Sequence, residues 1–113
     1  MGKRDDKIAI YARDLRDKCG VEPDMDLLRR VTIACGPAIY DPEAELVSAG
    51  DADERARIKR NFLMRRLGLP DSPELNDAID AVLDIYGRGE ARKYRAVVYY
   101  LLTRHFGRQN AFA

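Results

Sequence analysis

The sequence contains few of the residues that usually carry chemistry. Its 113 residues include two cysteines and one histidine, and no CxxC, P-loop, GxGxxG, HExxH or GxSxG motif occurs. The longest apolar run, Ala96–Leu102, is far shorter than the roughly 20 residues that a membrane-spanning helix needs. The sequence therefore predicts no cofactor, no metal site and no membrane segment, and we expect a protein that is not an enzyme.

The N-terminus and the cysteines favour a cytoplasmic location. The first six residues, MGKRDD, are followed by no apolar stretch of the kind found in a signal peptide. Cys19 and Cys35 each directly precede a glycine at the expected end of a helix, which is typical of small, reduced, partly buried side chains. A disulfide between them is the alternative, and a cytoplasmic location disfavours it.

The apolar pattern predicts an all-α fold. Apolar residues make up 46% of the chain, which is enough for a core, and the length leaves room for a single domain over residues 1–113. No stretch alternates between apolar and polar residues as a half-buried strand would. Helices are expected over residues 5–19, 25–35, 52–67, 73–86 and 90–106, with a short one starting at Asp41-Pro42-Glu43. The prediction is a compact bundle of five to six helices.

The last long helix is expected to lie at the centre of this bundle. Its segment 94–102 (YRAVVYYLL) is apolar on nearly every side, as in a helix that other elements surround. One layer of neighbours would leave part of such a helix uncovered, so the sequence leaves a homodimer open. Residues 108–113 are expected to form a loose tail in which Phe112 is the residue able to dock.

Charge is distributed unevenly, although the net charge is only +1. Residues 1–54 carry 8 basic and 13 acidic groups, whereas residues 55–113 carry 12 basic and 6 acidic groups. The aromatic residues lie mostly on the buried face of the last helix, and a pI near 7.8 is low for a dedicated nucleic-acid binder. Nucleic acid is therefore not the expected partner.

The helix over 52–67 has an unusual arrangement of cations. With α-helical spacing, Arg55, Lys59 and Arg66 fall in a row between two apolar edges, where they must extend outward or meet an acceptor. Three interpretations remain open. The cations pair with acidic residues of this chain, such as those of helix 73–86; they bind an external anion or the carboxylates of a partner; or the helix phase is misplaced.

Helix 90–106 contains the remaining candidate residues. Arg95 lies beside tyrosines on this helix and is a candidate for binding an anion or a partner, although nothing in the sequence specifies its ligand. His105 falls on the apolar face, where we expect a core histidine that satisfies carbonyls at the end of the helix. Tyr99 is expected to anchor a polar contact. The sequence defines no catalytic role for His105 or Tyr99.

Three segments together resemble a known family. The segments CGPAIY at 35–40, KRNFLMRRLGL at 59–69 and KYRAVVYYLL at 93–102, in this order, resemble the bacterial domain-of-unknown-function family 2853. The resemblance implies a small, all-helical bacterial protein. It implies no activity and no functional residues.

These observations predict a non-enzymatic protein-interaction module whose partner the sequence does not identify. The alternative is an anion or nucleic-acid binder that uses the basic helix 52–67. The candidate binding residues are Arg55, Lys59, Arg66 and Arg95.

Overall fold

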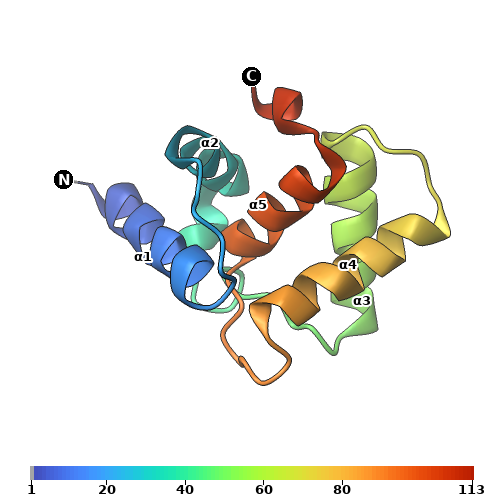
Figure 1. Cartoon of the computed structure of the whole chain (residues 1–113), viewed down its shortest axis with the longest axis horizontal. Helices are drawn as coiled ribbons and strands as arrows, with labels where there is room; N and C mark the ends of the chain where they lie inside the picture. The colour runs from blue at the N-terminus through green and yellow to red at the C-terminus, as the bar shows by residue number, and fades with distance from the viewer. Residues whose placement is uncertain (1) are drawn as a thin grey trace.

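The computed structural model describes residues 2–113 and consists of helices joined by short loops (Figure 1). Its elements are the α-helices α1 (Lys3–Asp17), α2 (Met25–Cys35), α3 (Ala52–Arg57), α4 (Pro73–Tyr86) and α5 (Arg95–Phe106), the 3₁₀-helices η1 (Gly36–Tyr40) and η3 (Gln109–Phe112), and the π-helix η2 (Ile58–Arg66). Across residues 2–113, β pairing is limited to a single bridge between Leu46 and Tyr94. The prediction of an all-α bundle is confirmed.

Helix α5 lies at the centre, with α1 and α2 on one side and α3 and α4 on the other (Figure 1). Every residue of the segment Ala96–Leu102 is buried except Tyr99, which is half-buried. A helix that is apolar on nearly every side is stable in water only when neighbours surround it. The prediction of a buried C-terminal helix is confirmed. Because a single chain covers this helix, the uncovered side that left a homodimer open is not found in residues 2–113.

Helix α5 begins at Arg95, so the predicted start near residue 90 is wrong. The backbone N–H of Arg95 donates to the carbonyl of Glu45 at 2.7 Å, and that of Val47 donates to the carbonyl of Lys93 at 2.8 Å. These bonds use backbone groups that a longer helix would pair internally. The same pairing holds residues 41–50 as turns and extended chain, and the short helix expected at Asp41 is replaced by η1, which precedes it.

The C-terminal segment docks on the core, so the predicted loose tail is wrong. Phe112 is 5% exposed. Arg30 Nη1 donates to the Phe112 carbonyl at 2.9 Å, and the Arg66 guanidinium lies over the Phe112 ring, 4.8 Å from its centroid. One buried aromatic ring with a cation on its face offsets the entropy lost in ordering a short segment.

The helix over residues 52–66 changes from α to π winding at Ile58. In a π-helix the bonds run from residue i to i+5, so a turn holds more residues than the 3.6 of an α-helix. The wider turn places Ile58, Phe62, Leu63 and Leu67 on one face, and all four are buried. The prediction of a continuous α-helix is therefore wrong in phase from Ile58 onward. The two apolar edges become one, and the cations lie along its borders.

Candidate functional site

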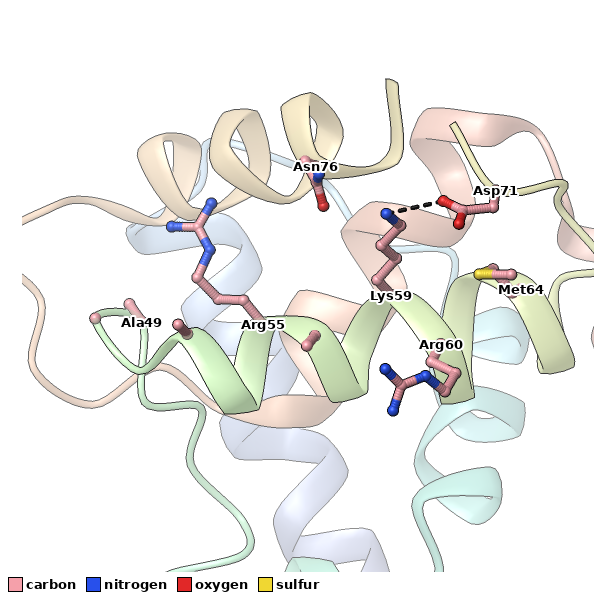
Figure 2. A pocket seen from close by; sticks show the side chains of 10 residues that line it. Ala49, Arg55, Lys59, Arg60, Met64, Asp71 and Asn76 are labelled. Atoms are coloured by element: carbon pink, nitrogen blue, oxygen red, sulfur yellow. Dashed lines mark ion pairs between the residues drawn. The ribbon is translucent and has the colours of Figure 1, made fainter. Parts of the chain in front are cut away.

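An open groove lies between the helix over 52–66 and α4 (Figure 2). Its volume is about 790 Å³. Its floor is apolar and consists of Ala49, Ala52, Ala56 and Met64. Ala52 and Ala56 are both exposed. They are one helical turn apart, so two small side chains lie in a row along the floor, parallel to the helix axis.

Three cations form the rim of the groove. Arg55 and Lys59 extend toward α4, whereas Arg60 extends away from it (Figure 2). Arg55 pairs with Asp80 of α4, and Lys59 Nζ lies 2.8 Å from Asp71 Oδ1. Arg60 is exposed and forms no ion pair with any of residues 2–113. Within residues 2–113, the rim therefore combines two weakly engaged cations with one that has no ion pair.

Arg95 borders a different cleft, of about 310 Å³, on the other side of the helix over 52–66. Its guanidinium pairs with the buried carboxylate of Glu54 and donates to the carbonyls of Ala44 at 2.9 Å and Leu46 at 3.3 Å. It also donates to Tyr99 Oη at 3.3 Å. Arg95 thus uses its donors to hold the segment before α3 against α5, and few remain for a ligand.

Tyr99 anchors a polar contact, as predicted, because its oxygen accepts a bond from Arg95. Its ring stacks on Phe62 with the centroids 3.9 Å apart. Burial raises the pKa of the Tyr99 phenol, against the opposing effect of the Arg95 guanidinium, so the hydroxyl remains protonated at neutral pH.

Arg66 and His105 lie away from the groove. Arg66 rests on Phe112, at the opposite border of the apolar face from Lys59. His105 is exposed, so its predicted core position is wrong: it lies in the last turn of α5, beyond the buried segment that ends at Thr103. The structure therefore brings Arg55 and Lys59 together and leaves Arg66 and Arg95 in separate places.

Sequence reasoning missed Arg60 and the apolar floor. Arg60 directly follows Lys59, and the spacing of Ala52 and Ala56 is visible in the sequence. What the sequence did not give was the position of α4, which makes the second wall of the groove (Figure 2).

The cysteines are free and weakly reactive. Burial raises the pKa of the Cys19 thiol to about 11 and that of the Cys35 thiol to about 12, so both stay protonated at neutral pH. Residues 2–113 contain no group of three or more His, Cys, Asp or Glu side chains placed to hold a metal ion. Among the helices described, none is both long and apolar enough to cross a membrane.

The fold and the groove define a small all-α domain with a basic-rimmed, apolar-floored surface groove. Residues 10–110 match the model of the family described as "Protein of unknown function (DUF2853)", and the chain belongs to this family. The earlier resemblance is confirmed. No curated protein matches the chain in a sequence search.

Proposed function

We propose that the chain is a non-enzymatic protein-interaction module that binds an acidic segment of a partner protein in the groove between the helix over 52–66 and α4. One observation carries the proposal: an apolar floor and a basic rim occur in the same open groove (Figure 2). The floor offers apolar area to bury, and the rim selects for charge.

The rim favours carboxylates. The Arg55 and Lys59 side chains are about a quarter exposed, while those of their partners Asp80 and Asp71 are 45% and 63% exposed. Ion pairs as exposed as these contribute about 0–1 kcal/mol each. A partner's carboxylates can replace Asp71 and Asp80 at little cost, and Arg60 supplies a cation that, within residues 2–113, has no ion pair to give up.

The floor favours a protein over a nucleic acid. Alanine and methionine side chains bury the apolar side chains of a partner, which a phosphate backbone does not provide. The groove lining includes no aromatic side chain on which a base could stack. The alternative, a nucleic-acid binder, has its own support in the exposed cations Arg57, Arg60 and Arg65 on the solvent side of the same helix. We also propose a bacterial, cytoplasmic protein, which the two free cysteines support.

Fluorescence anisotropy with synthetic peptides tests the proposal. The probe is a labelled peptide of about 16 residues, roughly four helical turns, in which glutamates flank a stripe of leucine and alanine. We expect saturable binding that weakens with salt and is lost when the glutamates are replaced by lysines. Lys59→Gln and Arg60→Gln should each weaken it about three- to tenfold, by loss of one charge contact each.

Arg13→Gln provides the matched control, because Arg13 is an exposed cation of α1 outside the groove. It should leave peptide binding unchanged. Saturable binding of a DNA or RNA oligonucleotide, with no binding of the acidic peptide, would overturn the proposal in favour of the nucleic-acid alternative.

A further inference from the structure

The walls of the groove also determine the backbone conformation of its occupant. We propose that the bound acidic segment is an amphipathic α-helix that packs along the row of alanines, with carboxylates on both of its flanks. This inference rests on the function proposed above. Three features of the groove carry this inference: the small residues of its floor, the bonding of backbone groups inside the helices that line it, and the placement of its cations.

The floor fits the ridge of another helix. Ala52 and Ala56 are exposed and one turn apart, Ala49 precedes them, and Met64 lies further along the same side. Small side chains between larger ones form the kind of groove into which the side-chain ridge of a second helix packs, with the helix axes about 8–10 Å apart. The flexible Met64 side chain can adapt to the residue that meets it.

The backbone chemistry disfavours an extended occupant. Extended peptides usually bind by adding a strand to a sheet edge. Most of the groove lining belongs to the helix over 52–66, with Asn76 from α4, and backbone groups inside these helices are already bonded within each helix (Figure 2). An extended segment would press its own N–H and C=O groups against alanine side chains without partners, whereas a helix satisfies them internally. A polyproline segment needs an aromatic-lined groove, and the lining contains no aromatic residue.

The cations define the pattern of acidic residues on the partner. Arg55 and Lys59 extend toward α4, whereas Arg60 extends away from it (Figure 2). A helix lying between them meets cations on both flanks of its apolar stripe. From Ala52 to Met64 the floor is shorter than the roughly 18 Å of an α-helix of that length, because the π winding after Arg57 advances less per residue. The partner segment is therefore about three turns long, with a narrow apolar stripe and acidic residues on either side of it.

Two acidic peptides of the same composition test this inference. One is locked as a helix by a hydrocarbon staple on its solvent side, and the other carries a proline in its centre, which breaks a helix. We expect the stapled peptide to bind at least about tenfold more tightly, because its ordering cost is removed in advance.

Ala56→Leu tests the same inference from the protein side. Ala56 is exposed, so a leucine fills the groove without disturbing the core. It should weaken binding of the stapled peptide about tenfold or more. Ala9→Leu is the control, because Ala9 is an exposed alanine of α1 and its replacement should have no effect. A circular dichroism melt confirms that both variants are folded.

The possible failures are distinguishable. If both peptides bind equally well and Ala56→Leu has no effect, the helical occupant is wrong, while the acidic-partner function stands. If neither peptide binds the unaltered protein, the proposed function fails and this inference fails with it.

Discussion

Two ion pairs on opposite sides of the same helix show how burial changes the role of a contact between a cation and a carboxylate. Glu54 and Arg95 have side chains only 6% and 17% exposed, and Arg95 is further bonded to two backbone carbonyls. Lys59 and Asp71 have side chains 24% and 63% exposed, and each has only the other as an ion-pair partner within residues 2–113. The buried pair fixes the segment before α3, whereas the exposed pair leaves its charges available to a partner.

The difference between buried and exposed charged groups extends to the two halves of the molecule. Buried carboxylates meet tyrosines on the α1 side: Tyr86 Oη donates to Asp14 at 2.5 Å, and Tyr11 Oη donates to Glu45 at 2.5 Å. These contacts tie α1 to α4 and to the segment before α3. The groove side carries charges of the same kinds, but they lie at the surface. Buried polar contacts thus join the elements on one side of the fold, whereas the charged groups on the groove side remain exposed.

The largest expected effect comes from breaking the buried pair. Glu54→Ala leaves the Arg95 guanidinium buried without its counter-charge, which should lower the free energy of unfolding by about 3–5 kcal/mol. Asp71→Ala removes a carboxylate from the exposed pair and should cost less than about 1 kcal/mol. Urea denaturation of both variants measures the difference. Equal losses would show that burial does not separate the two pairs.

A smaller effect is expected from alkaline pH. Burial and the neighbouring carboxylates Glu45 and Asp14 raise the pKa of Tyr11 and Tyr86 above the usual value of 10.0 for tyrosine. Above pH 10 the unfolded chain loses phenol protons that the folded protein retains, so unfolding releases protons and is favoured as the pH rises. The two protonated tyrosines make their full contribution to the free energy of unfolding below pH 10. This contribution is lost as the pH rises past 10, by up to about 1.4 kcal/mol per tyrosine per pH unit.

Denaturant titrations at several pH values check this expectation. The free energy of unfolding should be nearly level from pH 7 to 9 as far as these tyrosines are concerned and should fall between pH 10 and 11. Tyr86→Phe should make that fall shallower, whereas Tyr40→Phe, at an exposed position, should not. A slope unaffected by Tyr86→Phe would contradict the assignment.

The sequence predicted the fold well where local signals determine it. Helices α2 and α4 have the predicted bounds: Asp24 accepts a capping bond from the Leu27 N–H, and Pro73 occupies the first turn of α4. The start of α5 was not predictable in this way, because the bond that ends the preceding loop comes from Glu45, about fifty residues earlier in the chain. No local pattern reports such a contact.

The candidate site was predicted only in part, because local spacing identifies some of its residues but not the packing of distant ones. Arg55 and Lys59 were identified because α-helical spacing left cations between two apolar edges. That conflict reflects the change to π winding, which buries Ile58 and Leu63 on one face. The apolar floor needs α4 as its second wall, and the packing of two helices distant in sequence is not visible from either one alone.

The smallest expected effect is on peptide binding, and it distinguishes a charge within the groove from the net charge of the protein. Asp71→Asn frees Lys59 from its exposed partner, and we expect the acidic peptide to bind about two- to fivefold more tightly at low salt, with little change in stability. Asp84→Asn makes the same change in net charge on α4, where Asp84 pairs with Arg88 away from the groove lining. Anisotropy titrations should show tighter binding for the first variant only. If both variants tighten binding equally, the gain comes from net charge, and the Lys59–Asp71 pair does not compete with the partner for the groove.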